Sequence, residues 1–171
     1  MYRTEDGKRI LLRRATRRDI RDIVRLWQAL ADERKYIGTD RVTVEQKSRW
    51  VKSIRDRGVL WVLAELESDL VGSLSLARYR DSEKTRHVRN LAMGVAREYR
   101  GMGVGTALMD YAVRWARRQR SVKKIVLSVF STNTKAIALY RKFGFAYEGR
   151  RKKQFLIQGK YVDEIMMGRF M

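Results

Sequence analysis

The sequence of 171 residues has no cysteine, no proline and a single histidine, His87. Without cysteine the chain can form no disulfide bond, thiol nucleophile, zinc finger or iron–sulfur site. With one histidine it can build no multi-histidine metal site, and a hydrolase triad of the serine type would have to use His87. These absences exclude thiol chemistry and the commonest metal centres from the candidate functions.

Long apolar runs are absent as well. Residues 1–9 do not contain the apolar core of a signal peptide, and no segment approaches the ~18 apolar residues that a membrane-spanning helix needs. No stretch rich in glycine, serine or proline divides the sequence, and no internal repeat is present. We therefore expect one soluble, cytoplasmic domain over residues 1–171 that does not associate with membranes.

Positive charge is in large excess. Basic residues outnumber acidic ones by 39 to 19, which gives a formal charge of +20, while 44% of the residues are apolar or aromatic. This apolar fraction is too high for a disordered basic tail, so the charge is expected to cover a folded body. The excess is +8 in residues 1–57, zero in residues 58–99 and +12 in residues 100–171. The most basic part of the chain is therefore its last third.

Hydrophobic periodicity predicts a mixed α/β (α+β) domain. Apolar residues run together or alternate in segments typical of strands, and recur every three or four residues in segments typical of helices. The predicted strands are residues 10–14, 59–66, 71–79, 87–95 and 123–130, followed by a hairpin that turns at Gln158-Gly159 and runs to Phe170. The predicted helices are residues 20–31, Thr43 to Gly58, Gly103 to Trp115, and a last one that starts after Thr132 or Asn133 and ends at Gly144. This order places a strand–helix–strand unit near the centre of a mixed sheet.

Three glycines, Gly101, Gly103 and Gly105, lie in a turn between a predicted strand and a predicted helix. Because glycine has no Cβ, the backbone there can approach a ligand closely, and the unpaired N–H groups of the helix's first turn form an anion site. A Walker A loop is excluded, since Thr106 and Ala107 follow Gly105, and the spacing does not match the Rossmann G-x-G-x-x-G pattern. Chemistry alone favours a phosphate site and a simple packing turn about equally.

Two motifs in this region resemble those of the GCN5-related N-acetyltransferase (GNAT) superfamily. The first is Arg100-x-x-Gly103-x-Gly105 after a strand that ends in Val95, and it is similar to that family's acetyl-CoA-binding motif. The second is Asn133-Thr134-Lys135-Ala136-Ile137-Ala138-Leu139-Tyr140-Arg141-Lys142-Phe143-Gly144-Phe145, which is similar to the family's N-x-x-A-x-x-L-Y-x-x-x-G-F helix. The resemblance implies a mostly antiparallel mixed sheet flanked by about four helices, with a central parallel strand pair that splays to hold acetyl-CoA.

The same resemblance implies roles for individual residues, with acetyl-CoA as the co-substrate. The residues assigned to acetyl-CoA are Met93, Gly94, Val95, Arg100, Gly101, Met102, Gly103, Val104, Gly105, Thr106 and Asn133. Tyr140 would be the general acid that protonates the departing thiolate, since a phenol has a pKa near 10. Residue chemistry by itself also allows Asn133 to be an ordinary helix cap and Tyr140 to be a core residue.

The general base is not identified by the sequence. Many relatives use a carboxylate on the central strand, but Asn90 stands where we would expect it, and an amide cannot accept the proton. His87, Glu148 and an ordered water relay are the candidates that the residues leave open. The amide N–H of Gly94 or Val95 could polarise the thioester oxygen without any special side chain.

Three kinds of function are consistent with these features. The first is acetylation of a small primary amine, such as an amino acid or its analogue. The second is acetylation of a peptide N-terminus on a ribosome-bound target, with nonspecific nucleic-acid contacts through Arg114, Arg117 and Arg118, which otherwise simply face solvent. The third is a regulator that binds acyl-CoA or RNA without catalysis. Intact Asn133 and Tyr140 favour an enzyme over a regulator.

The acceptor pocket is expected to involve the first two helices and the final hairpin. Trp27, Tyr36, Tyr147 and Phe155 in these segments either line a pocket or complete the core. Related enzymes often pair through C-terminal strands, so a homodimer is a possible assembly.

The net charge also bears on the acceptor. A protein of charge +20 repels polycations, and this disfavours polyamines as acceptors. A local acidic pocket built from Asp32, Glu33 or Glu148 could override the repulsion.

Overall fold

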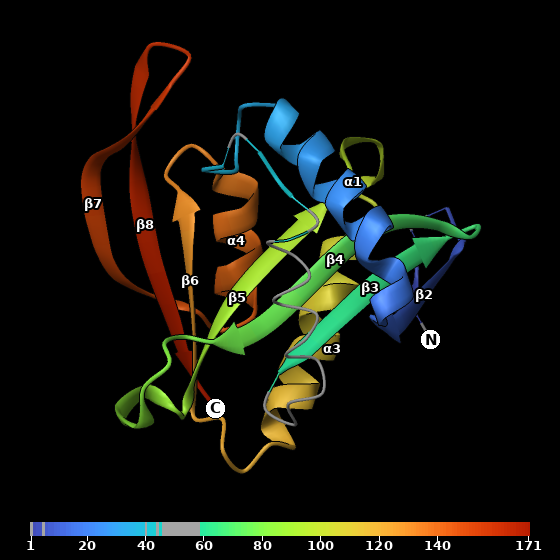
Figure 1. Cartoon of the computed structure of the whole chain (residues 1–171), viewed down its shortest axis with the longest axis horizontal. Coiled ribbons are helices and arrows are strands. Elements are labelled where there is room, and N and C mark those ends of the chain that lie inside the picture. Colours follow the sequence, from blue (N-terminus) through green and yellow to red (C-terminus); the bar gives the residue numbers. More distant parts are fainter. Residues whose placement is uncertain (1, 5, 40, 44, 46–58) are drawn as a thin grey trace.

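A single eight-stranded sheet forms the centre of the protein (Figure 1). The computed structural model describes residues 2–4, 6–39, 41–43, 45 and 59–171. The strand order is β1-β2-β3-β4-β5-β6-β8-β7, and neighbouring strands run antiparallel except for the parallel pair β5 and β6. The strands are β1 (Tyr2–Arg3), β2 (Arg9–Arg14), β3 (Leu60–Leu66), β4 (Asp69–Arg78), β5 (Val88–Val95), β6 (Lys124–Phe130), β7 (Ala146–Ile157) and β8 (Lys160–Phe170).

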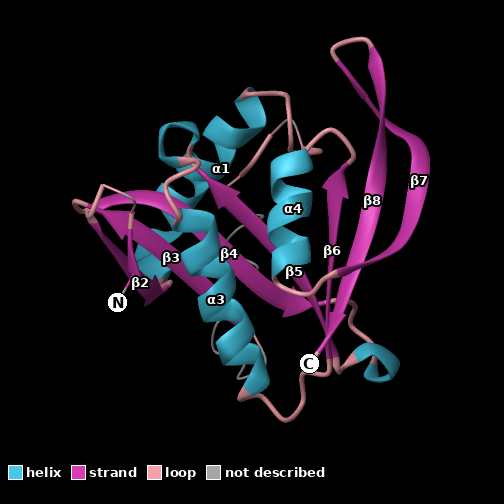
Figure 2. Cartoon of the chain, turned by 180° about the vertical axis from the view of Figure 1, so that it is seen from behind, coloured by secondary structure: helices cyan, strands magenta, loops and turns pink. Residues whose placement is uncertain are grey.

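Helices cover both faces of this sheet. Among the described residues the α-helices are α1 (Ile20–Asp32), α3 (Val104–Arg117) and α4 (Thr134–Lys142), and short 3-10 segments are Arg17–Asp19, Glu83–Thr85 and Arg97–Tyr99. α1 lies on one face, in front of the sheet in Figure 1, whereas α3 and α4 lie on the other face, which Figure 2 turns toward the viewer. None of the helices in these ranges is long and apolar enough to cross a membrane.

The predicted fold class is confirmed, including the central parallel pair. Each predicted strand and helix that falls within the described ranges is found close to its predicted bounds. The two-residue β1 was not predicted; it pairs with β2 at the edge of the sheet. The helix predicted from Thr43 to Gly58 falls almost entirely outside the described residues.

An apolar stripe holds α1 against the sheet. Ile23 and Trp27 of α1 are buried in one cluster with Trp61 and Leu63 of β3, as their three- and four-residue spacing predicts. The Trp27 indole N–H donates a 2.9 Å hydrogen bond to Ser73 Oγ on β4, so its polar atom is satisfied in the interior. Both contacts fix the position of α1 over the middle strands.

The larger core lies between the sheet and the helices of the opposite face. Leu108 and Ala112 of α3 are fully buried with Leu74 of β4 and Ile125 of β6. Burying a leucine side chain of this kind stabilises the fold by roughly 1.5–3 kcal/mol. This packing holds the start of α3 directly after the end of β5, and α4 likewise begins just after the end of β6 (Figure 2).

An ion pair braces the entry into α1. The Arg13 guanidinium donates to both carboxylate oxygens of Asp19, at 2.9 and 2.6 Å, and the Thr16 N–H donates to Asp19 at 2.6 Å. Chiefly because of the hydrogen bonds from Arg13, the pKa of Asp19 is lowered from 3.8 to about 2. The ionised form of Asp19 therefore stabilises the folded state.

We expect Asp19→Asn to lower the free energy of unfolding by roughly 1–2 kcal/mol at pH 7. Because the pKa of Asp19 is lower in the folded than in the unfolded chain, its contribution is present above about pH 4 and is lost as the pH falls toward 2. Urea unfolding of both proteins at pH 7 and pH 3 measures the difference, which should shrink at the lower pH. An equal difference at both pH values would contradict this role.

β5 and β6 separate part of the way along their length. Their parallel pairing covers only Val88 to Asn90 on β5 and Lys124 to Val126 on β6. Beyond this point β5 stays paired with β4 as far as Val95, and β6 stays paired with β8 as far as Phe130. The predicted splay of the central pair is therefore present, and it opens toward the N-termini of α3 and α4.

Candidate active site

A cavity of about 1010 Å³ opens where β5 and β6 separate. Its walls come from the end of α1 and the loop after it, the outer halves of β5 and β6, the glycine turn, α4 and the final hairpin. Of the eleven residues assigned to acetyl-CoA, all but Met102 and Val104 line this cavity. Val104 is 1% exposed because its side chain packs into the core, so only its main chain is available to a ligand.

The glycine turn lies between the end of β5 and the start of α3, as the sequence predicts. Gly101 and Gly103 have φ angles of +82° and +85°, a region that favours glycine. A Cβ at Gly101 would have no neighbour within 4 Å, and a Cβ at Gly103 would meet only the Arg3 carbonyl oxygen at 3.7 Å. Conformation, not crowding, therefore requires glycine here, and the space beside the turn is open to a ligand.

The first-turn amides of α3 follow this turn directly. The α3 N-cap is Gly103, and the helix begins at Val104, so the N–H groups of its first turn have no partner within the helix. Gly105 and Thr106 of that turn line the cavity. Such a helix start, next to an open glycine turn, fits the pyrophosphate of acetyl-CoA.

Arg97, Arg100 and Lys135 add positive charge around this end of the cavity. Arg100 also has a structural task. Its Nε–H donates to the Val95 carbonyl at 3.0 Å, and its two terminal nitrogens donate to the Glu33 carboxylate at 2.8 and 2.5 Å. Arg100 therefore ties the glycine turn and the end of β5 to the C-terminal end of α1.

Asn133, the N-cap of α4, and Tyr140, in its last turn, both line the cavity. Asn133 caps the helix, since its side-chain oxygen accepts the Ala136 N–H at 3.3 Å. Tyr140 is 6% exposed and packs near Phe145, with ring centroids 6.0 Å apart. Burial raises the pKa of Tyr140 to about 12, so its phenol is protonated at neutral pH.

Alternate side chains of β6 point to opposite faces of the sheet, and this identifies the two sides of the cavity. Ile125, Leu127 and Val129 of β6 pack in the core with α3 and α4. By alternation, Ser128 and Phe130 point to the α1 face of the sheet. Because β5 and β6 have separated at this level, the cavity connects the α4 face, where Tyr140 lies, with the α1 face.

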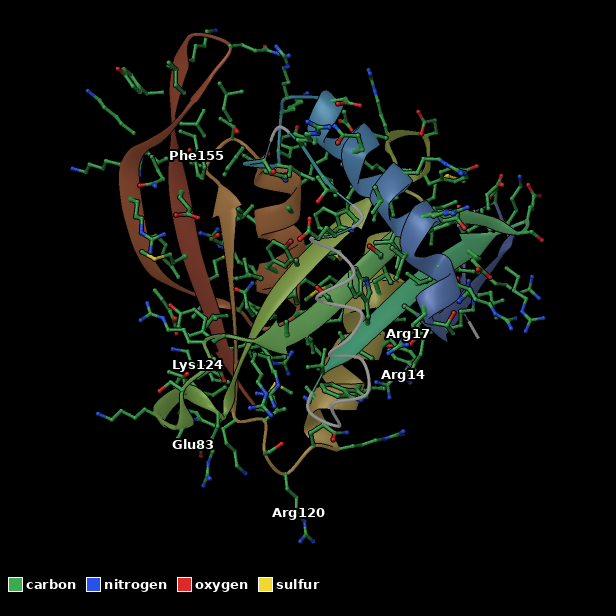
Figure 3. All side chains as sticks on the ribbon, viewed as in Figure 1. Arg14, Arg17, Glu83, Arg120, Lys124 and Phe155 are labelled. Carbon is green, nitrogen blue, oxygen red and sulfur yellow. The ribbon has the colours of Figure 1, made fainter. Side chains whose placement is uncertain are left out.

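Aromatic side chains dominate the α1 side of the cavity. Trp27, Tyr36 and Phe155, for which the sequence left open a pocket or the core, line it, and Phe155 packs against Phe130 with ring centroids 4.6 Å apart. Figure 3 shows Phe155 on the final hairpin, and its partner Phe130 is the last residue of β6. Tyr147, on the same strand β7 as Phe155, is 57% exposed and neither lines the cavity nor completes the core.

Neither of the two side chains considered as a general base from the sequence, His87 and Glu148, lines this cavity; Asn90 does, but it is an amide. His87 is exposed and precedes β5, at the end where β5 and β6 are still paired. Glu148 forms a 2.7 Å ion pair with Lys124 at the beginning of β6. Phe155 packs at the opposite end of β6, against Phe130 (Figure 3). The structure therefore removes His87 and Glu148 from the site.

One lining carboxylate was missed by the sequence analysis. Glu164 of β8 is 8% exposed and borders the cavity on the α1 side. Its sequence signal is weak: it is a charged residue in the same alternation phase as the buried Val162. Only the pairing of β8 with β6 brings Glu164 beside Phe130.

Sequence comparison identifies relatives over most of the chain. The family model for the acetyltransferase (GNAT) family matches residues 22–145. An L-amino acid N-acetyltransferase of Escherichia coli is 31% identical over 152 residues, which cover 88% of this chain and 93% of that protein. A spermidine N(1)-acetyltransferase of Escherichia coli is 27% identical over 124 residues, covering 72% of this chain and 65% of that protein.

Comparison with solved structures also identifies N-acetyltransferases as similar proteins. A ribosomal-protein-alanine N-acetyltransferase from Brucella melitensis superposes with a TM-score of 0.85 at 26% identity, covering 94% of this chain and 99% of that chain. Two further neighbours, at 20% and 21% identity, share the fold and were solved with acetyl-CoA. The chain belongs to the GNAT family of acetyltransferases, enzymes that use acetyl-CoA as their co-substrate.

Proposed function

We propose that the chain transfers the acetyl group of acetyl-CoA to the primary amine of a small, amino-acid-like acceptor by direct attack. The observation that carries this proposal is the cavity between β5 and β6, which joins Tyr140 on one face of the sheet to the aromatic pocket on the other. An amine held on the α1 side can approach the thioester carbonyl while the thiolate departs on the α4 side. Holding both reactants in one cavity supplies much of the rate enhancement.

The main chain holds acetyl-CoA in this proposal. The outer half of β5, from Met93 to Val95, pairs with the pantetheine arm as an added strand would. The first-turn amides of α3 bind the pyrophosphate, and the Asn133 side chain contacts the arm while it caps α4. The N–H of Gly94 or Val95 polarises the thioester oxygen.

Tyr140 acts as the general acid. The amine first forms the carbon–nitrogen bond on one side of the carbonyl carbon. As the carbon–sulfur bond then breaks, Tyr140 donates its phenolic proton to the sulfur. Because burial raises the pKa of Tyr140 to about 12, the phenol carries its proton at neutral pH. Burial of the ring excludes water from the same position.

The charges of the cavity favour an amino-acid-like acceptor over a polyamine. Two carboxylates line the described part of the cavity, and each is paired with an arginine: Glu33 with Arg100 and Glu164 with Arg151. Asp32, which was considered for an acidic pocket, lies outside the cavity and accepts a hydrogen bond from Gln28. No surplus of negative charge is therefore available for a second and third ammonium group.

We expect purified protein to consume acetyl-CoA with amino acids, and kcat/KM for the best amino acid to exceed that for spermidine at least about tenfold. Thiol release in the presence of amino acids, short peptides and polyamines measures both quantities. If peptides are turned over preferentially, the acceptor is a peptide N-terminus and not a small amino acid. Absence of thiol release with every amine would refute the proposed function.

A further inference from the structure

Glu164 of β8 lines the cavity on the α1 face of the sheet. It lies directly opposite Phe130 in the register of β8 and β6, and cross-strand partners share one face of a sheet. Glu164 is therefore on the α1 face, together with Ser128 and the aromatic pocket. Its side chain is 11% exposed, and that exposure is toward the cavity.

The hydrogen bonds of the two lining carboxylates distinguish them. Both oxygens of Glu33 accept from Arg100, near the glycine turn, so Glu33 is engaged at the phosphate end of the cavity. Glu164 accepts at 2.5 Å from Arg151, and only through Oε2. Within the part of the chain that the structure describes, Oε1 has no hydrogen-bond partner.

Arg151 sets the position of the Glu164 side chain. It is the direct cross-strand neighbour of Glu164 on β7, it donates to Oε2 alone, and Glu164 lines the cavity. A carboxylate held in this way is a preorganised receptor for an ammonium group, because its desolvation is already compensated by the guanidinium. Arg151 itself does not line the cavity.

We propose that Glu164 binds the ammonium group of the acceptor and accepts its first proton. This inference rests on the proposed function and supplies the general base that the sequence does not identify. The proton passes from nitrogen to Glu164 and on to solvent, and the neutral amine then attacks the thioester carbonyl. The carbon–nitrogen bond forms, the carbon–sulfur bond breaks, Tyr140 protonates the sulfur, and the second proton lost by nitrogen restores Tyr140 through solvent. The net reaction releases one proton.

The test is Glu164→Gln, with Asp163→Asn as the matched control. Glutamine keeps the size of the side chain and one oxygen for Arg151, and it removes the charge and the proton acceptor. Asp163 is the adjacent residue of β8, pairs with Arg150 and does not line the cavity, so its variant makes the same charge change outside the site. Thermal unfolding and acetyl-CoA binding confirm that both variants are folded.

At pH 7 we expect Glu164→Gln to lower kcat/KM about 100-fold without changing the affinity for acetyl-CoA, and Asp163→Asn to change it less than about threefold. The loss should diminish as the pH approaches the pKa of the acceptor amine, about 8 to 10, because solvent then supplies the neutral amine. Glu164→Asp, which keeps the proton acceptor, should retain the wild-type pH profile at a reduced rate; it also serves as the test if the glutamine variant does not fold.

Each outcome is decisive. A Glu164→Gln enzyme as active as the wild type, or one whose loss is equal at every pH, overturns the role of Glu164 and leaves the proposed function intact. If the wild-type protein turns over no amine, the proposed function fails, and the role of Glu164 fails with it.

Discussion

Gly103→Val is expected to weaken acetyl-CoA binding at least about 100-fold, equivalent to roughly 2.7 kcal/mol. Gly103 has a φ of +85°, which a β-branched residue adopts only at a large cost, so the turn must rearrange. The rearrangement moves the N–H groups from Gly101 to Thr106, which form the proposed anion site together and cannot be replaced by a side chain. Isothermal titration calorimetry with acetyl-CoA measures the loss.

Gly159→Val separates backbone strain from the binding effect. Gly159 has a φ of +76°, and a Cβ there would have no neighbour within 4 Å, which closely matches the local strain of Gly103→Val. It lies in the turn between β7 and β8, outside the cavity, so acetyl-CoA affinity should stay at the wild-type value. Wild-type affinity in a folded Gly103→Val variant would rule out the glycine turn as the phosphate site.

Tyr140→Phe is expected to lower kcat about 100-fold while the dissociation constant of acetyl-CoA changes less than about threefold. The substitution removes only the hydroxyl, and the ring keeps its packing beside Phe145. The departing thiolate then has no proton donor in a position from which burial excludes water. Steady-state kinetics by thiol release, with calorimetric binding of acetyl-CoA, separates chemistry from affinity.

Tyr111→Phe is the control for Tyr140. Tyr111 is half-buried on α3, packs beside the same core and does not line the cavity, so its variant should keep wild-type kcat. The pH dependence adds a second check: with a pKa of about 12, Tyr140 contributes no loss of activity below about pH 11. A Tyr140→Phe enzyme with unchanged kcat would assign Tyr140 to the core alone.

The distribution of charge along the sequence reflects the fold. Residues 58–99 carry six basic and six acidic side chains, so their charges balance, and they form β3, β4 and β5 at the centre of the sheet. The basic last third supplies the glycine turn, α3, α4 and the hairpin. Some of its cations are engaged locally, as Arg114 is with Asp110, whereas Arg120 points away from the body into solvent (Figure 3). The basic side chains of this third are therefore partly paired and partly exposed.

The elements that the sequence predicted well are those whose signal is local. α1 follows from apolar residues every three or four positions, because one helical face must be buried against the sheet. The glycine turn follows from Gly101 and Gly103, because few other residues adopt positive φ angles. The cap at Asn133 follows from its side chain, which can accept a hydrogen bond from an N–H in the first helical turn.

The features that the sequence did not predict depend on partners far along the chain. β1 has only two residues, and its place at the sheet edge depends on pairing with β2. Tyr147 is as aromatic as Phe155, yet Phe155 contacts Phe130 whereas Tyr147 is exposed. Nothing in the local sequence pattern distinguishes these two aromatic residues, because strand register decides which of them lines the cavity.

By itself, the sequence determined the order of strands and helices, the family resemblance and the glycine turn, because periodicity, glycine positions and motif spacing act over a few residues. The tertiary structure decided which of the candidate proton acceptors lines the cavity. His87 and Glu148 are excluded by their position at the paired end of β5 and β6, and Glu164 enters only because β8 runs antiparallel beside β6. A proton acceptor is defined by its distance from the reacting atoms, and contacts between strands more than thirty residues apart set that distance.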